Sequence, residues 1–268
     1  MNIIFLSSIV LAAIGILAAV ILYFVSQKFK VYEDPKIDEV AELLPGANCG
    51  GCGFAGCRNF AEMVVKNGGL GDLSCPPGGA GVNSAVSAVF GGGELKVVPK
   101  VAIVKCNGNC ENAPAKIQYD SIPSCAYFNM IDAGESGCAF GCLGCGDCVK
   151  ACKFGAIHID AKTKLPVIDE AACGCCGGCA KACPRAIIGI VPKHEEGVVY
   201  VACMNKDKGG EAKKNCSVAC IGCKKCEKTC EFTAIVVENN LACITPDKCT
   251  ACKKCVEGCP AKSIFAVA

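Results

Sequence analysis

Cysteine spacing carries the clearest chemistry in this sequence. The pattern C-x2-C-x2-C-x3-C occurs four times, beginning at Cys142, Cys173, Cys220 and Cys249. In this spacing, three thiolates hold one [4Fe–4S] cluster and the fourth reaches the cluster of the neighbouring run. The four runs therefore predict two tandem bacterial-type 2[4Fe–4S] ferredoxin-like modules.

The crossed arrangement assigns a ligand set to each cluster. In the first module these sets are Cys142, Cys145, Cys148 with Cys183, and Cys173, Cys176, Cys179 with Cys152. In the second module they are Cys220, Cys223, Cys226 with Cys259, and Cys249, Cys252, Cys255 with Cys230. Zinc is the alternative, but tetrahedral zinc favours two separated pairs, whereas three ligands spaced at i, i+3 and i+6 suit the corners of a cube.

Two further cysteine groups precede the modules. Cys49, Cys52, Cys57 and Cys75 lie on a glycine-rich stretch and supply four thiolates for a fifth [4Fe–4S] cluster, with structural zinc as the alternative. A second group is a candidate sixth cluster, a zinc site or a set of spare thiols. It comprises Cys106, Cys110, Cys125 and Cys138.

Composition narrows the function classes. The chain has 268 residues, 28 of them Cys and two of them His, with a net charge of +2 and no Trp. This cysteine spacing favours reduced, metal-binding thiolates over disulfides. We expect His158 and His194 to be structural, and nothing in the charge or aromatic content indicates nucleic-acid binding. The run from Gly51 to Gly56 matches G-x-G-x-x-G, but no strand precedes it, so we expect no dinucleotide site there.

The N-terminal segment predicts a membrane anchor. The uncharged run from Ile3 to Val25 has 23 residues, and as a helix it would extend about 34 Å, enough to cross a bilayer. A signal peptide would have a basic n-region and a shorter apolar stretch. Lys28 and Lys30 follow the run, so we expect a single-pass span in the cytoplasmic membrane with the cluster domains on the cytoplasmic side.

The predicted fold is therefore α+β, with one transmembrane helix followed by small cluster-binding domains. Pattern and turn signals predict helices from Pro35 to before Pro45, over 58–66 and over 83–90, and strands over 96–104, 156–160, 165–168, 234–238 and 242–244. The expected domains are an anchor (1–26), a linker helix (27–46), a small [4Fe–4S] domain (47–95), a connecting segment with the candidate extra cluster (96–138), ferredoxin module 1 (139–192) and ferredoxin module 2 (193–268).

A longer internal repeat relates the two modules. The residues around Cys203 and Cys216 resemble those around Cys106 and Cys138, because each pair precedes a ferredoxin-type run at a similar position. The second copy has no counterpart of Cys110 or Cys125. Any extra cluster is therefore expected in the first copy only.

The chain has an apolar span, then a C-x2-C-x4-C-x17-C group, then ferredoxin-type runs. In this order of motifs it resembles the B subunit of the Rnf electron-transport complex over essentially the whole chain. The resemblance implies an iron–sulfur subunit of an ion-translocating ferredoxin:NAD⁺ oxidoreductase. It would receive electrons from soluble ferredoxin and pass them to other Rnf subunits, while the chain alone is an electron carrier. The complex would pump Na⁺ or H⁺, and flavin and NAD⁺ would bind to neighbouring subunits.

Two other functions fit parts of the pattern. A membrane polyferredoxin serving a hydrogenase or another respiratory dehydrogenase would carry the same runs and the same anchor. A zinc-stabilised interaction module would retain the cysteines without redox chemistry. A lysine-rich stretch over 201–230 favours an acidic redox partner such as ferredoxin, although a solvated charge run would look the same.

Overall fold

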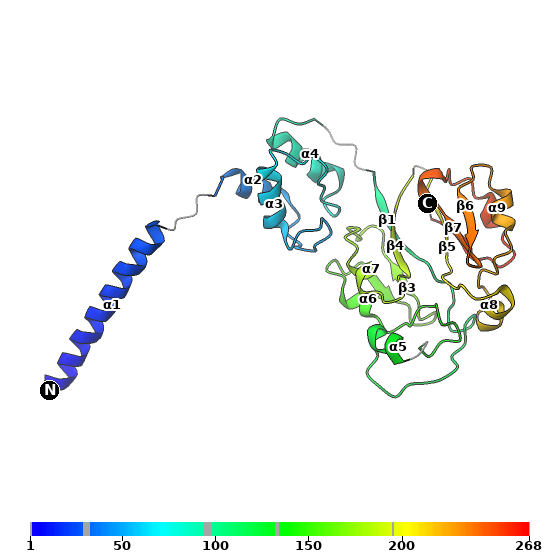
Figure 1. Ribbon diagram of the computed structural model, residues 1–268, viewed down its shortest axis with the longest axis horizontal. Helices are drawn as coiled ribbons and strands as arrows, with labels where there is room; N and C mark the ends of the chain where they lie inside the picture. The colour runs from blue at the N-terminus through cyan, green and yellow to red at the C-terminus, as the bar shows by residue number, and fades with distance from the viewer. Residues whose placement is uncertain (1, 29–32, 94–97, 132–133, 195, 268) are drawn as a thin grey trace.

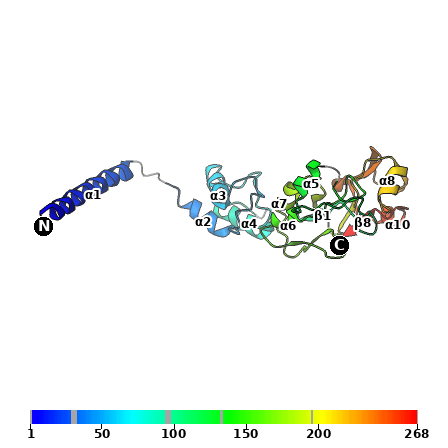
Figure 2. The same cartoon turned by 90° about the horizontal axis from the view of Figure 1, so that it is seen from below.

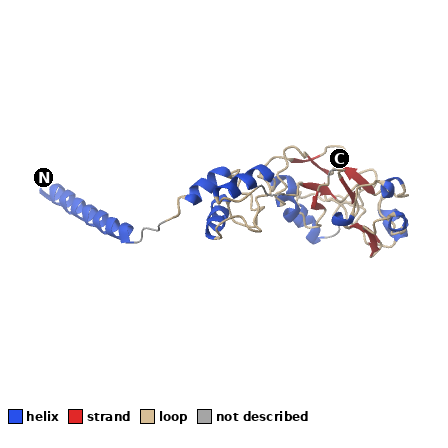
Figure 3. Cartoon of the chain, turned by 90° about the horizontal axis from the view of Figure 1, so that it is seen from above, coloured by secondary structure: helices blue, strands red, loops and turns tan. Residues whose placement is uncertain are grey.

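The computed structural model describes residues 2–28, 33–93, 98–131, 134–194 and 196–267. Three parts follow one another along its length (Figures 1 and 2). A single long helix stands at the N-terminal end, a small helical domain comes next, and a body of short strands and helices forms the other end. Figure 3 shows that strands are confined to this last body. The expected α+β organisation is confirmed.

The N-terminal helix, α1, has no core of its own. It runs over Asn2–Lys28, which corresponds to about 40 Å at 1.5 Å per residue. Its large apolar side chains from Phe5 to Val25 are exposed, and no part of its apolar window is buried within the chain. An apolar helix that is exposed all round needs an apolar solvent. The predicted span is therefore present as one continuous helix.

The small domain is built from three helices around its own apolar core. They are α2 (Lys36–Leu43), α3 (Cys57–Lys66) and α4 (Gly79–Val89). The Asp34 carboxylate accepts a hydrogen bond from the backbone N–H of Lys36 at the start of α2, and α2 ends one residue before the Leu44–Pro45 bond, as predicted. On α3, Phe60 and Val64 are fully buried, while Val65 is only partly buried. The third helix begins four residues earlier than the sequence predicted.

Each ferredoxin module has an outer strand pair and an inner hairpin. In module 1 the outer strands are β1 (Lys100–Val104) and β4 (Ile188–Pro192), and the inner ones are β2 (Ile157–Ile159) and β3 (Pro166–Ile168). In module 2 they are β5 (Val198–Val201) and β8 (Ile264–Val267), with β6 (Ile235–Glu238) and β7 (Leu241–Ile244). All four pairs are antiparallel.

Short helices fill the remaining parts of the body. One helix carries the third cysteine of each ferredoxin-type run: α6 (Asp147–Lys150), α7 (Gly178–Ala182), α9 (Lys225–Thr229) and α10 (Lys254–Glu257). The others are α5 (Cys125–Ile131), α8 (Gly209–Asn215) and the 3₁₀ turn η1 (Pro246–Lys248). The sequence predicted the inner hairpins but did not single out β4, β5 or β8.

The strand expected over 96–104 is β1, which begins directly after Pro99; residues 94–97 lie outside the described part. It pairs with β4 in the register Lys100 to Pro192 through Val104 to Ile188. A strand from the connecting segment therefore completes the sheet of module 1. β5 does the same for module 2 by pairing with β8.

Cysteines form much of the core of the body. Around module 2, the largest cluster of buried side chains contains six buried cysteines, interleaved with small apolar residues such as Ala212, Ala219 and Ala242. In module 1 the corresponding cluster has only Cys148, Ile157 and Ile188 buried. Strands of three to five residues cannot fold alone. Cysteine ligation must therefore supply much of the folding free energy.

Removing iron should unfold this body while leaving α1 intact. We expect an anaerobic chelator to abolish amide protection through most of the described residues 98–267, because their elements are too short to persist without thiolate ligation. Hydrogen exchange followed by mass spectrometry in detergent measures this. Residues 5–28 are the internal control, since their hydrogen bonds are all within one helix. Retained protection in β1–β4 after full iron loss would contradict the expectation.

Candidate iron–sulfur centres

In module 2 the structure brings the crossed cysteine sets together. One cavity of about 340 Å³ is lined by Cys220, Cys223, Cys226 and Cys259. A second cavity of about 330 Å³ is lined by Cys230, Cys249, Cys252 and Cys255. Each cavity therefore takes three cysteines from one run and the fourth cysteine of the other run. This is the arrangement that holds two cubes in a bacterial ferredoxin.

Module 1 shows the same crossing. A cavity of about 360 Å³ is lined by three of the four predicted cysteines, Cys142, Cys148 and Cys183, and by Cys125 in place of Cys145. Cys145, from the same run, lies close enough to Cys142 for their two thiols to interact electrostatically. At the second site of the module, Cys152 lies close enough to Cys176 and Cys179 to interact with both electrostatically, although it belongs to the first run.

A left-handed residue follows the second cysteine of every run. These residues are Gly146 and Gly177 in module 1 and Lys224 and Lys253 in module 2, with φ between 59° and 83°. The left-handed conformation turns the chain so that the next helix starts beside the cavity. Glycine adopts this backbone without strain, whereas each lysine does so at a cost of about 1 kcal/mol. The loops thus wrap around their cavities in the same way in both modules.

Burial disfavours the negatively charged form of these thiols. It raises the pKa of Cys148, Cys226 and Cys255 to about 11 and that of Cys142 to about 12. The buried sulfurs therefore carry protons at neutral pH until a metal displaces them. A cavity ringed by such groups fits a metal cluster, because iron supplies the positive charge that the surroundings lack.

Cys259 is the exception among these thiols. Burial acts to raise its pKa, but hydrogen bonds from the Ser263 hydroxyl and from the backbone N–H groups of Ala261, Lys262 and Ser263 lower it overall. The Cys259 Sγ and Ser263 Oγ atoms are 3.5 Å apart. The equivalent position in module 1, four residues after Cys183, is Ile187. The two modules therefore differ in one hydrogen bond to a ligand sulfur.

Two asparagines position two of the four cysteines of the small domain. The amide of Asn83, which is 1% exposed, accepts from the Cys75 backbone N–H at 2.8 Å and donates to the Cys75 carbonyl at 3.0 Å. Asn48 accepts from the backbone N–H of Cys57 at 2.8 Å. Cys75, Cys52 and Cys57 all pack against the domain core. These contacts fix the loops that carry the predicted fifth site.

The ligand loop of the small domain lies against module 1. A Cβ atom added to Gly51 would lie 2.9 Å from the Cα of Cys176, so only glycine permits this approach. Lys153 donates from its ammonium group to the Asn48 carbonyl at 2.5 Å. Lys153 occupies the position after Cys152, where such runs usually have proline, and this contact accounts for the lysine there. Cys49 and Cys176 are electrostatic neighbours.

The structure does not bring the four remaining predicted cysteines together. Cys106 and Cys138 line a cavity of about 300 Å³ that lies between the modules. Cys125 lines the cavity of Cys142 and Cys148 instead. Cys110 is exposed, and its sulfur lies 3.8 Å from the Thr163 carbonyl. The sequence grouped these four cysteines because they are neighbours along the chain. Their spacing does not show which of them lie together in the folded protein.

The two histidines lie outside the cysteine-lined cavities described above. His158 is on β2, where its side chain is exposed, and pairs with Val167. The Nε2 atom of His194 lies 3.0 Å from the Pro246 carbonyl, at η1.

Comparison with known proteins agrees with this geometry. Residues 44–77 match a family described as "Putative Fe-S cluster", and residues 141–207 match a 4Fe-4S dicluster domain. The B subunit of the ion-translocating oxidoreductase complex from Methanosarcina acetivorans is 42% identical, with 95% of each chain covered. The B subunit of the Na⁺-translocating ferredoxin:NAD⁺ oxidoreductase complex from Acetobacterium woodii is 42% identical over 95% of this chain and 75% of its own length. The corresponding subunit of the proton-translocating complex from Clostridium ljungdahlii is 39% identical over 100% of this chain and 94% of its own length.

An apolar anchor helix, cysteine-lined cavities and these domain matches define a membrane-associated iron–sulfur protein that transfers electrons. The identity to full-length relatives is specific enough to go further. The chain belongs to the family of B subunits of the Rnf, or ion-translocating ferredoxin:NAD⁺ oxidoreductase, complex. It is thus an electron-transfer subunit of a multi-subunit oxidoreductase, and the resemblance inferred from the cysteine order is confirmed.

Replacing Cys152 tests the crossed arrangement. We expect Cys152→Ser to remove about four iron atoms and to abolish the EPR signal of the site containing Cys173, Cys176 and Cys179. The site formed by its sequence neighbours Cys142, Cys145 and Cys148 should remain. Cys243→Ser is the matched control, because Cys243 is exposed on β7. Selective loss of the Cys142 site would contradict the crossed arrangement.

Replacing Ser263 tests how hydrogen bonding tunes one site. A hydrogen bond to a ligand sulfur stabilises the more negative, reduced state, so Ser263→Ala should lower the potential of the site containing Cys259. A net bond of about 1 kcal/mol corresponds to about 40 mV for one electron. Redox titration followed by EPR measures the shift. The surface variant Ser121→Ala, at an exposed serine, should leave every potential unchanged, and an equal shift in both variants would refute the assignment.

Proposed function

We propose that module 2 accepts electrons from reduced soluble ferredoxin and that the small domain passes them toward the membrane subunits of the complex. A [4Fe–4S] cluster supplies a one-electron redox centre at each cysteine site when bound. The work of this chain is to hold those centres close together, to shield them from water and to set the charge around them. We further propose that these domains lie on the cytoplasmic side and that α1 contacts other Rnf subunits.

The order of the sites along the molecule supports this direction. The loop of Cys49 contacts the loop of Cys176, so the site of the small domain and a site of module 1 are neighbours. Module 2 lies at the end of the molecule away from α1 (Figures 1 and 2). A soluble donor would therefore reach module 2 first, and the membrane subunits would lie nearest the small domain.

Charge around module 2 favours an acidic donor. Both of its runs contain the sequence Cys-Lys-Lys-Cys, at 223–226 and at 252–255. Cys223 and Cys252 are exposed, as are the lysines beside them. Lys254 forms an ion pair with Glu231 at 2.6 Å. The corresponding positions in module 1 are Gly146, Asp147, Gly177 and Gly178. Positive charge next to an exposed ligand cysteine steers a negatively charged partner to the point of shortest electron transfer.

The coupling ion is not expected to depend on this subunit. The relatives from Acetobacterium woodii and Clostridium ljungdahlii are similarly identical to this chain, yet one is named for Na⁺ and the other for protons. A single span such as α1 offers no ion path of its own. We therefore propose that ion selectivity belongs to other subunits of the complex.

The decisive experiment mixes the purified, cluster-loaded chain with reduced ferredoxin under anaerobic conditions. We expect rapid reduction, and the double variant Lys224→Glu/Lys225→Glu should slow it about tenfold at low salt, because electrostatic steering is lost. The matched control is Lys162→Glu/Lys164→Glu, which reverses two exposed charges in module 1. Stopped-flow absorbance measures the rate. No reduction of the wild-type chain would remove the proposed entry role, and equal rates in both charge variants would move the entry point away from module 2.

A further inference from the structure

We propose that Cys106, Cys138, Cys203 and Cys216 hold a sixth [4Fe–4S] cluster at the junction of the two ferredoxin modules. The inference extends the proposed electron-transfer role to a site made of two cysteines from each copy of the internal repeat. It differs from the grouping that sequence spacing suggested, in which all four ligands came from the first copy.

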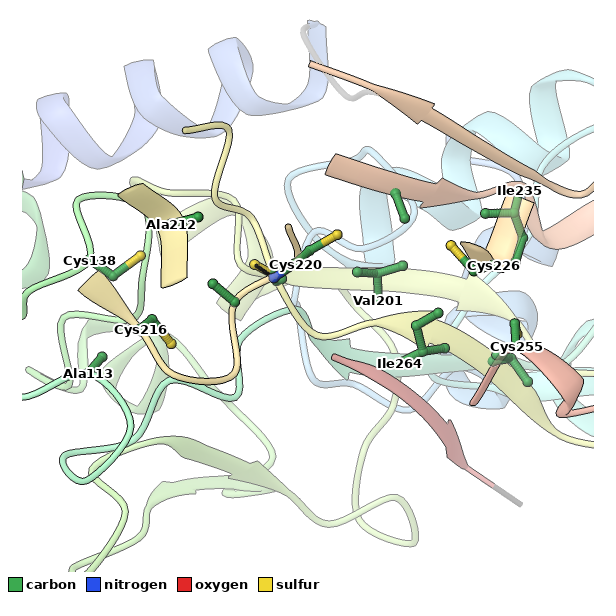
Figure 4. Close-up of a cluster of buried hydrophobic side chains, with 14 of the residues drawn as sticks. Ala113, Cys138, Val201, Ala212, Cys216, Cys220, Cys226, Ile235, Cys255 and Ile264 are labelled. Carbon is green, nitrogen blue, oxygen red and sulfur yellow. Dashed lines mark hydrogen bonds between the residues drawn. The ribbon is translucent and has the colours of Figure 1, made fainter. Parts of the chain in front are cut away.

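The four cysteines line one cavity. The space between its walls, partly open to solvent, is about 300 Å³. The corresponding spaces at three ferredoxin-type sites are about 330, 340 and 360 Å³. The junction cavity therefore has nearly the size that this same chain provides for a cube. Cys138, Cys203 and Cys216 are buried in the core of the body. Figure 4 shows Cys138 and Cys216 in this core together with Cys220 of module 2.

Hydrogen-bond donors converge on these sulfurs from both modules. The backbone N–H of Cys142 donates to Cys106 Sγ at 3.4 Å, and that of Cys220 donates to Cys203 Sγ at 3.3 Å. Cys142 and Cys220 occupy equivalent positions in the repeat, as do Cys106 and Cys203. The same contact is therefore made twice, once from each copy. N–H groups directed at ligand sulfurs stabilise the charged form of a cluster.

A buried side-chain amide reinforces this arrangement. Asn205 is 1% exposed, and its Nδ2 atom donates to Cys138 Sγ at 3.4 Å. Its backbone N–H donates to Cys203 Sγ at 3.5 Å, and its Oδ1 accepts from the backbone N–H of Asp207. A neutral thiol is a weak acceptor for a buried amide. A sulfur that carries negative charge from a bound cluster satisfies the amide far better.

Glycine keeps the space between the two copies open. A Cβ atom added to Gly108 would lie 3.2 Å from Cys216 Sγ and 3.8 Å from Cys106 Sγ. A side chain there would enter the space between the sulfurs of opposite copies.

A zinc ion is the alternative occupant of a site with four thiolates. At about 2.3 Å from zinc, tetrahedral thiolates lie roughly 3.8 Å apart. Within the described residues, no group of three or more Cys, His, Asp or Glu side chains is placed to hold one metal ion. All four cysteines are free thiols. The space at the junction is nearly as large as those at the ferredoxin-type sites, which favours an iron–sulfur core over a single ion.

The location gives this site a role in joining the modules. Cys142 and Cys220, whose N–H groups contact its sulfurs, are the first ligand cysteines of the two modules. The junction site therefore lies between the first site of module 1 and the first site of module 2. Six sites would then form one series from module 2 to the small domain.

The first test counts metal in the full-length chain, purified in detergent under strictly anaerobic conditions. The double variant Cys203→Ser/Cys216→Ser should lose about four iron atoms and about four sulfides per chain relative to wild type. Mössbauer and EPR spectra should lose one component and keep five. Cys243→Ser is the matched control and should lose none. Unchanged iron in the double variant overturns the proposal, as does one zinc per chain that disappears with these two cysteines.

A second variant keeps the proposal testable if the double variant fails to fold. Asn205→Ala retains all four thiols but removes a donor to Cys138. We expect unchanged iron content and a lower midpoint potential for one component, distinct from the component that Cys152→Ser removes. No shifted component overturns the proposal. Cys110→Ser should retain all iron, and a loss of four iron atoms there would instead favour the grouping from sequence spacing.

Both readouts are independent of ferredoxin. Failure of ferredoxin to reduce the chain would remove the proposed entry role and leave the iron count untouched. Conversely, unchanged iron in the double variant would remove the junction site and leave the entry role intact.

Discussion

The constraint on which the rest of the body depends is the crossing of cysteines between runs. Cys152 and Cys183 each end one run yet lie with the cysteines of the other, and Cys230 and Cys259 do the same in module 2. Each cavity can therefore be completed only when both halves of a module are in place. Strands of three residues and helices of four or five residues have little stability of their own. We therefore expect cluster ligation, rather than a large apolar core, to make each module a cooperative unit.

The same crossing sets how the sites are tuned. Buried thiols favour their protonated form, so the protein compensates each bound cluster with N–H and O–H groups directed at sulfur. The number of these donors differs between equivalent sites: Ser263 donates near Cys259, whereas Ile187 offers no side-chain donor near Cys183. Two modules with the same spacing can therefore have different potentials.

Contacts between domains turn separate sites into one series. Gly51 brings the loop of the small domain against Cys176, and Lys153 holds it there through the Asn48 carbonyl. At the other side of module 1, the internal repeat places Cys106 beside Cys203 across a pseudo-symmetric junction. Cys-Lys-Lys-Cys segments place positive charge at the far end. The architecture is thus extended, with an anchor at one end and a charged surface at the other.

The sequence by itself determined the local chemistry. The i, i+3, i+6 spacing specified the ferredoxin-type sites, the apolar run specified α1, and alternation specified the inner hairpins, because each of these signals lies within one short stretch of chain. The tertiary structure decided what depends on distant residues: the pairing of β1 with β4, the docking of Gly51 against Cys176, and the partners of Cys106 and Cys138. Spacing grouped these last two with Cys110 and Cys125, their neighbours in the chain. Folding instead set them beside Cys203 and Cys216, because cysteines from both copies of the repeat line one cavity between the modules, and contacts between distant residues do not appear in the spacing along the chain.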